Sequence, residues 1–493
     1  MKEIYFKEEA RNLIFSGIQK LHNAVASTLG PNGKTVIITD TYGKPYVTKD
    51  GVSVARKIYF KDPVENIGAE LVKEVCELQV KQAGDGTTTA IVLANAFIQN
   101  LKDFDSNDIN KAFDEIIPKV IEQLKLNSKE LKREDIKHVA SISANNDVQI
   151  GNVIQQAYDF SNIIKVEESN NLEDTLDTVD GMQLDISYMS KRFTNTPKEH
   201  CELNNPNVLL LDGKLEDLMC FKTILEKISN NDESILIITE YVSEKELRKL
   251  ESNVLSGNIK LCVIKTPGFG PTRKDFIRDL SDFTGAEIIN IQPGKQYSPS
   301  CLGRLKSCTI TKNNSLLIKH DEINVDDIVS NLKTLSKNKE LTTYDLEVIN
   351  KRIENLTAKA SVIKVGGGSE IEMKERKDRY DDAVLAVACA LEEGIVAGGG
   401  VALFKIGIEH ETNKNLLKEK LIDSLLTPYL KIYPERIEIF ENETIYKYPL
   451  EDKFKENIID PLKVTRCALE NAVSIAKTIL STDTIILDER QWN

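Results

Sequence analysis

The sequence predicts a multidomain α/β protein: a mostly helical domain with a small β-hairpin, interrupted by an inserted α/β domain. Two observations lead to this fold class. Apolar residues recur at helical spacing near the start of the chain and again after about residue 361. Between about 180 and 360, short apolar runs alternate with charged helical stretches, as strands and helices do in an α/β domain. A helical pattern that opens the chain and resumes at its end indicates an insertion into one helical domain.

Each element follows from a local pattern of apolar, turn and capping residues. In the first hundred residues we expect a helix at 7–28, a strand at 35–39, its return strand at 45–48, a helix at 63–82 and another that begins at 87. In the middle we expect strands at 207–211, 235–239 and 261–265, and helices at 215–229 and 243–255. The last helices are expected at 381–393, 415–432 and 461–480.

The composition narrows the class of protein. The 493 residues include 64 Lys and Arg against 77 Asp and Glu, a net charge of −13. At about 150 residues per domain, this length suggests about three domains. An acidic chain argues against nucleic acid and anionic membranes as main partners.

The location and the redox state also follow from the composition. No apolar run approaches the roughly 18 residues of a membrane span. The first residues resemble neither a secretory signal nor a transit peptide, so we expect a cytoplasmic protein. The eight cysteines form no C-x-x-C pair and are expected to be reduced and mostly buried, which sets zinc chemistry aside.

The strongest local signal is the segment 83–90, Ala-Gly-Asp-Gly-Thr-Thr-Thr-Ala, between two predicted helices. Its glycines permit close backbone approach to a ligand, and its threonines place hydroxyls and N–H groups at a helix N-terminus, which favours an anion. Asp85 would repel that anion unless a cation lies between them. The segment therefore indicates a phosphate with Mg²⁺ bridging to Asp85. The alternative is a glycine linker followed by ordinary capping residues.

Two further loops fit the same picture. Residues 28–31 end the first helix, and 48–51 follow the hairpin. Lys49 could neutralise phosphate charge and Asp50 could help to hold metal or water, although each loop taken alone is more typical of a surface turn. The Gly-Lys-Thr tripeptide nearby is not a P-loop, because Thr28 stands where that motif needs its first glycine and a strand follows instead of a helix.

A third candidate lies late in the chain, where Asp381 and Asp382 are expected to open a helix that leads to the glycines at 398–400. Three successive glycines let a backbone lie against a flat or charged ligand, or they form a hinge. The aspartates could cap the helix, or one of them could orient an attacking water.

Ten segments resemble the group I chaperonin family, the GroEL type, and they run in family order from residue 6 to residue 488. They are TLGPNGKTVII, VTKDGVSVARKI, ENIGAELVKEV, AGDGTTTAIVLA, SISANND, GMQLD, KTPGFG, VIKVGGGSEIEMKER, LEEGIVAGGGVAL and IIDPLKVTRCALENA. The resemblance implies the chaperonin fold with three domains. These are an equatorial ATP-binding domain at 1–125 and 393–493, an intermediate hinge at 126–180 and 361–392, and an apical substrate-binding domain at 181–360.

The resemblance also implies an ATP-driven cycle with Mg²⁺, and with K⁺ as a further cation. Asp85 matches the family's magnesium ligand, and Asp488 matches the residue near the sugar. Asp382 matches the aspartate that swings in to activate water for hydrolysis, and Asp50 matches its helper. The implied ATP contacts are Thr28, Leu29, Gly30, Pro31, Lys49, Asp85, Gly86, Thr87, Thr88, Thr89, Gly399 and Asp488.

The implied partners are non-native proteins, a GroES-type co-chaperonin and further copies of the chain, in a heptameric single or double ring. The residues that match the family's client-binding set are Tyr188, Phe193, Leu225 and Leu247. Polar residues replace the usual apolar ones at Arg192, Lys222, Glu251 and Ser252, and the usual adenine-contacting segment is replaced around 445–454. The thinner apolar face leaves a ring-forming scaffold with reduced folding activity as the alternative; a conventional ATP-using enzyme such as a kinase is disfavoured by the missing P-loop.

Overall fold

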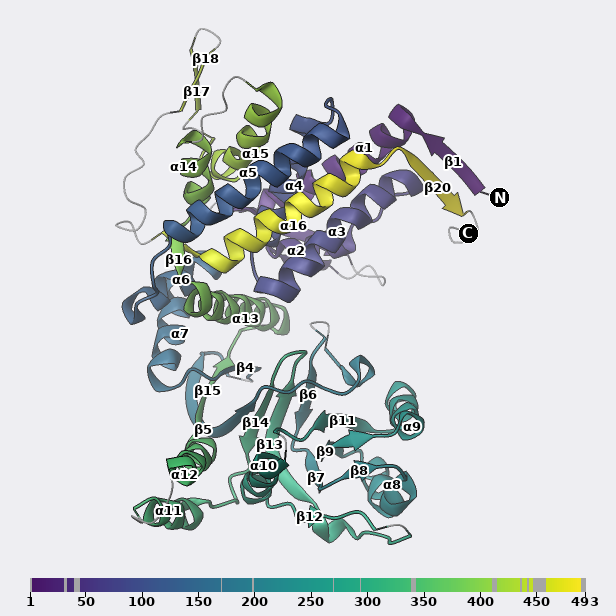
Figure 1. Ribbon diagram of the computed structural model, residues 1–493, viewed down its shortest axis with the longest axis vertical. Coiled ribbons are helices and arrows are strands. Elements are labelled where there is room, and N and C mark those ends of the chain that lie inside the picture. Colours follow the sequence, from purple (N-terminus) through teal and green to yellow (C-terminus); the bar gives the residue numbers. More distant parts are fainter. Residues whose placement is uncertain are drawn as a thin grey trace. The chain divides into compact units, whose positions relative to one another are not determined.

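The computed structural model divides into two compact units, each assembled from separate stretches of the chain (Figure 1). Unit 1 comprises Met1–Gln156, Val166–Thr175 and Lys364–Asn493, and unit 2 comprises Ala157–Lys165 and Leu176–Ile363. The structure describes residues 2–30, 33–39, 45–169, 171–196, 199–268, 270–292, 294–337, 343–409, 415–434, 437–440, 443–446 and 458–488. The predicted fold class is confirmed, whereas the finer division into three domains stays a prediction.

Unit 1 is mostly helical. Its helices are α1 (Lys7–Val25), α2 (Gly51–Lys57), α3 (Pro63–Ala83), α4 (Thr87–Leu101), α5 (Ser106–Leu126), α6 (Ile136–Ser143), α7 (Val148–Phe160, whose last turn belongs to unit 2), α13 (Glu370–Glu393), α14 (Val401–Glu409), α15 (Leu416–Ile432) and α16 (Leu462–Ser481). Its strands form antiparallel pairs: β1 (Lys2–Phe6) with β20 (Thr484–Asp488), β2 (Val36–Thr39) with β3 (Pro45–Thr48), β16 (Ile395–Ala397) with β19 (Ile459–Pro461), and β17 (Ile437–Phe440) with β18 (Glu443–Tyr446).

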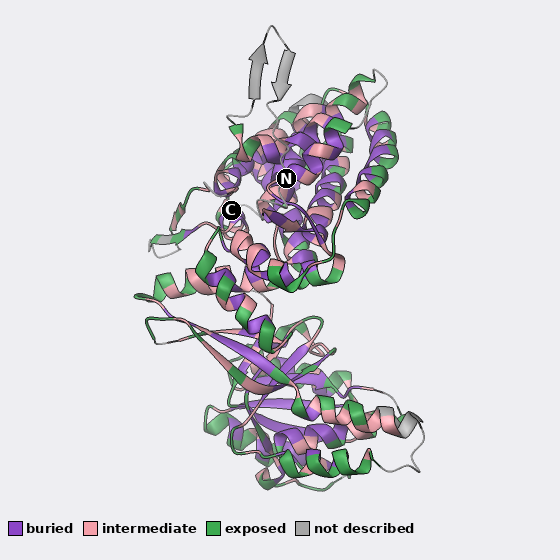
Figure 2. Ribbon diagram, turned by 90° about the vertical axis from the view of Figure 1, so that its left-hand side faces the viewer, coloured by how far each residue is buried: buried purple, intermediate pink, exposed green. Residues whose placement is uncertain are grey.

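Helix α4 forms the centre of the unit 1 core because its sequence is apolar on all sides. Its residues from 90 to 98 are buried without exception. The helix contacts α3, α15 and α16, and Phe97 packs edge-on against Phe113 of α5 with ring centroids 5.2 Å apart. Buried residues fill these helices on their inner sides (Figure 2). The core therefore holds the N-terminus of α4 in a fixed position.

Helices α1 and α3 approach each other closely because glycines lie where they touch. A Cβ added at Gly17 would lie 1.9 Å from the carbonyl oxygen of Glu65, and one at Gly68 would lie 2.4 Å from that of Ile14. Both distances are far below van der Waals contact, so no side chain fits at either position without separating the helices.

Unit 2 is an α/β unit built on a sheet that has ten strands in the described residues. The main path runs β11-β9-β7-β13-β14-β5-β15-β4, with β12 beside β7 and β6 beside β13. The strands are β4 (Ile164–Glu168), β5 (Thr175–Leu184), β6 (Cys201–Asn204), β7 (Asn207–Leu211), β9 (Ser234–Thr239), β11 (Lys260–Lys265), β12 (Ile288–Ile289), β13 (Gly303–Ile310), β14 (Ser315–Lys319) and β15 (Lys359–Val365). The unit boundary falls within β4, β5 and β15, so three strands continue from one unit into the other.

The parallel strands β7, β9 and β11 are the most deeply buried part of unit 2, as expected for strands covered on both faces. The helices of the unit are α8 (Lys222–Asn230), α9 (Glu244–Leu255), α10 (Gly270–Thr284), α11 (Asp326–Leu335) and α12 (Thr343–Thr357). A separate short pair joins β8 (Lys214–Leu215) and β10 (Tyr241–Val242).

Two predicted helices have different N-termini in the structure. The helix expected at 215–229 begins at Lys222, after β8 and a 3₁₀ turn, Leu218–Phe221. The helix expected at 381–393 begins at Glu370, where the Ser369 side chain caps it by accepting the N–H of Glu372. The apolar pattern did not reveal this N-terminus, because the first half of α13 is charged and has no clear apolar periodicity. Asp382 therefore lies inside a long helix and does not cap its start.

Two properties of the described chain bear on its environment. No helix in the described ranges is long and apolar enough to cross a membrane. All eight cysteines are buried and free of disulfides, as the sequence predicts.

We expect Gly17→Ala to destabilise unit 1 by about 1–3 kcal/mol, although alanine is the better helix former, because the added methyl group would overlap the Glu65 carbonyl. Urea-induced unfolding measures the change. Glu77→Ala on the exposed face of α3 is the control and should leave the midpoint within error. Equal midpoints for Gly17→Ala and the wild type would show that the close helix contact is not required.

Candidate functional site

One pocket in unit 1 gathers most of the predicted site residues. Its lining includes Thr28, Leu29, Gly30, Lys49, Asp50, Asp85, Gly86, Thr87, Thr88, Thr89, Asp382 and Gly399. These residues come from the end of α1, the β3–α2 turn, the α3–α4 turn, α13 and the turn after β16. Pro31 lies outside the described residues.

The N-terminus of α4 has the geometry and the electrostatics to attract an anion. Gly84 ends α3 at φ 71°, and Gly86 starts α4 at φ 84°, so both occupy the left-handed region that glycine tolerates. In the described structure no side chain caps α4 at its first turn. The first N–H groups of the helix therefore remain available, and the helix dipole favours negative charge beside them.

Asp85 is held in a fixed orientation beside this helix end. Its carboxylate accepts the Gly86 N–H at 2.5 Å and the Ser143 hydroxyl at 2.6 Å. Its backbone oxygen accepts the Gln79 side-chain amide at 2.7 Å. Burial raises the pKa of Asp85, and the charge of Asp50 raises it further, against the two hydrogen bonds. A bound cation would offset the unfavourable ionisation of this buried carboxyl.

Asp50 is fixed by the helix that follows it. It is the N-cap of α2, and its two carboxylate oxygens accept the N–H groups of Val52 at 3.0 Å and Ser53 at 2.9 Å. The side chain therefore keeps its direction while lining the pocket.

The pocket contains a carboxylate that the sequence reasoning missed, Asp460. Pairing of β16 with β19 places Val396 opposite Asp460, so the carboxylate reaches the following turn and accepts the Gly399 N–H at 3.0 Å. Burial, and then the charge of Asp85, raise the pKa of this half-buried side chain to about 6. The IIDP motif contained this residue, but only the strand pairing reveals its position.

Asp488 ends β20, where its backbone pairs in register with Lys2 of β1. Its assignment to the sugar of a nucleotide stays a prediction.

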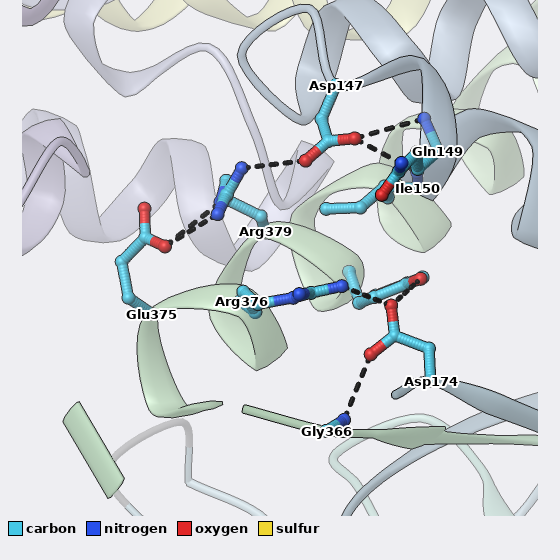
Figure 3. A network of polar contacts seen from close by, with 9 residues as sticks. Asp147, Gln149, Ile150, Asp174, Gly366, Glu375, Arg376 and Arg379 are labelled. Atoms are coloured by element: carbon cyan, nitrogen blue, oxygen red, sulfur yellow. Dashed lines mark hydrogen bonds and ion pairs between the residues drawn. The ribbon is translucent and has the colours of Figure 1, made fainter. Parts of the chain in front are cut away.

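One face of α13 also lines the pocket. It carries Glu375, Asp378, Arg379 and Asp382, at the three- and four-residue spacing that aligns side chains along a helix. Arg379 donates to Asp147 at 3.0 Å and to Glu375 at 2.8 Å (Figure 3). Asp147 in turn accepts the N–H groups of Gln149 and Ile150 at the start of α7. Sequence reasoning missed the first three α13 residues because it started the helix too late.

A second cluster anchors the start of α13 (Figure 3). The Asp174 carboxylate accepts the Gly366 N–H at 2.9 Å, the Tyr380 hydroxyl at 2.7 Å and an N–H of Arg376 at 2.5 Å. It thereby joins the segment before β5, the turn after β15 and α13, all within unit 1.

A family comparison identifies this arrangement. The model of the TCP-1/cpn60 chaperonin family matches residues 21–416, which is most of the chain. The chain belongs to the TCP-1/cpn60 chaperonin family.

The chaperonin fold also appears in the solved structures that the chain resembles. Two crystal forms of the chaperonin gp146 from the bacteriophage EL 2 (Pseudomonas aeruginosa), both in the presence of ATP-BeFx, match 98% of this chain and 99% of their own. The identities are 22% and 21%, with TM-scores of 0.67 and 0.62. At this identity the likeness concerns the fold.

The expected client-binding residues of this chaperonin lie in unit 2 and are not equally exposed. Tyr188, Leu225 and Leu247 are half-buried and pack against the unit 2 core. Phe193 is only 1% exposed, so it belongs to that core and presents no surface to a client. Its position in the 3₁₀ turn Lys191–Phe193 directs it inward.

Two of the polar residues that replace the family's usual apolar ones, Arg192 and Glu251, form an ion pair. The Arg192 guanidinium donates to the Glu251 carboxylate at 2.9 Å, and Glu251 of α9 is largely buried. The two charges therefore neutralise each other at positions where the family resemblance implies apolar side chains.

Asp460 makes the stability of this chaperonin depend on pH. A carboxyl whose pKa is higher in the folded than in the unfolded state destabilises the fold once it is ionised. The free energy of unfolding therefore falls as the pH rises from 3.8 to about 6. We therefore expect Asp460→Asn, without nucleotide, to be more stable than the wild type at pH 8 by about 1–2 kcal/mol and equal to it near pH 4. Urea unfolding at both pH values measures the difference.

Asp103→Asn, at an exposed position, is the matched control and should show no such pH dependence. A constant difference between Asp460→Asn and the wild type at both pH values would contradict the assignment.

Proposed function

We propose that this chaperonin hydrolyses ATP in the unit 1 pocket and uses the reaction to drive the folding of non-native proteins. The observation that carries the proposal is the meeting of the uncapped α4 N-terminus, Asp85 and Asp382 in one pocket. The phage chaperonin was crystallised in two forms in the presence of ATP-BeFx, and we extend that kind of ligand to this chain.

The charges of the pocket suit a nucleotide bound together with a divalent cation. Among the described lining residues, six carboxylates face two cationic side chains: Asp50, Asp85, Glu375, Asp378, Asp382 and Asp460 against Lys49 and Arg379. A triphosphate alone would be repelled by this excess. Mg²⁺ at Asp85 would neutralise phosphate charge there. The described residues contain no cluster of three or more His, Cys, Asp or Glu that could hold a metal by itself, so phosphate oxygens would complete its ligands.

The chain's own residues supply the remaining chemistry. The N–H groups and hydroxyls of Thr87, Thr88 and Thr89 would hold phosphate oxygens, with Lys49 as an added positive charge. Asp382 would accept the proton of the attacking water, and the fixed Asp50 carboxylate would help to orient that water. Because Asp382 lies on α13, the reaction depends on where that helix lies, which couples hydrolysis to conformational change.

Asp488 stays the residue that the family resemblance assigns to the sugar, and we propose Asp460 as a further contact with it. Its carboxylate lines the pocket beside the Gly399 turn, and a carboxylate can accept the hydroxyl hydrogens of a ribose. K⁺ is retained as a proposed further cation.

Assembly into a ring is part of the same proposal. Two separate strand pairs of unit 1 expose large apolar side chains: Ile37 on β2 is 72% exposed, and Ile486 on β20 is 60% exposed. Exposed apolar strands favour pairing with another chain. We propose a homo-oligomeric ring, heptameric and single or double, with a GroES-type co-chaperonin as lid. The eight reduced cysteines support the cytoplasm as its compartment.

A ring-forming scaffold with little folding activity is the second candidate. The Arg192–Glu251 ion pair and the burial of Phe193 favour it, because both reduce the apolar surface that non-native chains would bind.

We expect Asp382→Ala to bind ATP within about twofold of the wild type and to lose about a hundredfold or more in the rate of hydrolysis, because only the proton acceptor is removed. Calorimetric ATP binding and phosphate release measure the two quantities. Asp381→Ala, which alters a neighbouring carboxylate outside the described lining, is the control. Unchanged phosphate release by Asp382→Ala would remove Asp382 from the mechanism.

The folding role predicts that the wild type with Mg-ATP raises the refolding yield of a denatured enzyme and that Asp382→Ala does not. The measurement is recovered enzyme activity, first without a lid protein and then with one. Suppressed aggregation without any recovery under either condition would favour the scaffold candidate.

A further inference from the structure

A row of three aromatic rings ends at the pocket. Phe404 of α14 packs on Tyr429 of α15 with ring centroids 4.2 Å apart, and Tyr429 packs on Tyr433 at 5.0 Å. The first two rings are buried in a small core, whereas Tyr433 is half-buried and lines the pocket. The buried rings therefore fix the orientation of the ring that the pocket exposes.

The position of Tyr433 is also fixed by the turn that it touches. Tyr433 is the C-cap of α15, and its N–H donates to the Tyr429 carbonyl at 2.9 Å. A Cβ added at Gly399, whose φ is 63°, would lie 3.1 Å from the Tyr433 hydroxyl oxygen. On the same glycine, the N–H is bound by Asp460. Tyr433 and Asp460 thus contact the same turn.

The lining residues around Tyr433 differ chemically from those that suit phosphates. Leu403, Pro428, Ile432 and Ile458 come from α14, α15 and the segment before β19, and they are apolar. Ile432 also closes against Gly30, where an added Cβ would lie 3.1 Å from the isoleucine side chain. This apolar wall carries no charge that could hold a phosphate, and it ends in the half-buried ring of Tyr433.

We propose that Tyr433 is the base-recognition residue of the pocket: its ring covers one face of the purine of a purine nucleoside triphosphate. The inference rests on the proposed nucleotide function and adds the residue that holds the base. A flat aromatic base gains from stacking on an aromatic side chain whatever its edge groups are. The ring therefore holds the purine by its face, and adenine and guanine gain from Tyr433 alike.

The test separates the contribution of the Tyr433 ring to binding from the contribution of the phosphates. The affinities of Mg-ATP, Mg-GTP and Mg-tripolyphosphate are measured by calorimetry for the full-length wild type, Tyr433→Leu and Tyr433→Phe. Tyr433→Leu should weaken ATP and GTP by about fivefold or more and leave tripolyphosphate unchanged, whereas Tyr433→Phe should keep the wild-type affinities. In hydrolysis assays Tyr433→Leu should raise KM and leave kcat unchanged, because stacking acts equally in the ground state and the transition state. Tyr59→Leu, at an exposed tyrosine outside the described pocket lining, is the matched control.

Three results would overturn the inference. An unchanged ATP affinity and KM in Tyr433→Leu would show that the ring does not contact the base. Equal weakening of ATP and tripolyphosphate, or a loss of kcat, would show that Tyr433 only supports the fold of the pocket. If the wild type bound neither ATP nor GTP, the proposed nucleotide function would fall first and the inference with it.

Discussion

The rest of the site depends on one electrostatic constraint: carboxylates are crowded beside the open N-terminus of α4. Burial and the charge of Asp50 raise the pKa of Asp85, and burial and the charge of Asp85 raise the pKa of Asp460. The helix end, in contrast, favours negative charge. N–H or hydroxyl donors fix each of these carboxylates in place. The pocket therefore keeps negative side chains beside a helix end that attracts anions, and a cation bound together with an anion would neutralise both.

Helix α13 connects this pocket to the part of the chain that leads into unit 2. Its middle carries Asp382, Asp378 and Arg379 to the pocket, and its first turns are held at Asp174, just before β5. Tyr380, fully buried, contributes its hydroxyl to the same carboxylate. A single rigid helix thus carries both the proposed proton acceptor and the anchor next to the strands that cross the unit boundary. Under the proposed function, this continuity would provide the physical basis for coupling hydrolysis to a change in conformation.

In unit 2 the apolar side chains of α9 pack into the core, and a charged pair lies beside them. Leu247, Leu250 and Val254 of α9 all face the unit 2 core, so the helix keeps its packing stripe. The charges of Arg192 and Glu251 neutralise each other: the Arg192 side chain is exposed, whereas the Glu251 carboxylate is largely buried and would be left without this partner if Arg192 were removed. The apolar core therefore maintains the fold of unit 2.

Local patterns in the sequence determined the elements whose apolar period is strong: α1, α3, α4, α9, α15 and α16, and the strands β7, β9 and β11. They also determined the glycine turn around Asp85 and the threonine-rich helix start that follows it. The start of α13, by contrast, is set by a serine cap within a charged stretch, and no period marks it. Asp460 and Tyr433 entered the site only through tertiary structure. One is placed by the pairing of β16 with β19 and the other by a row of rings between α14 and α15, and both contacts join residues whose proximity no local pattern encodes.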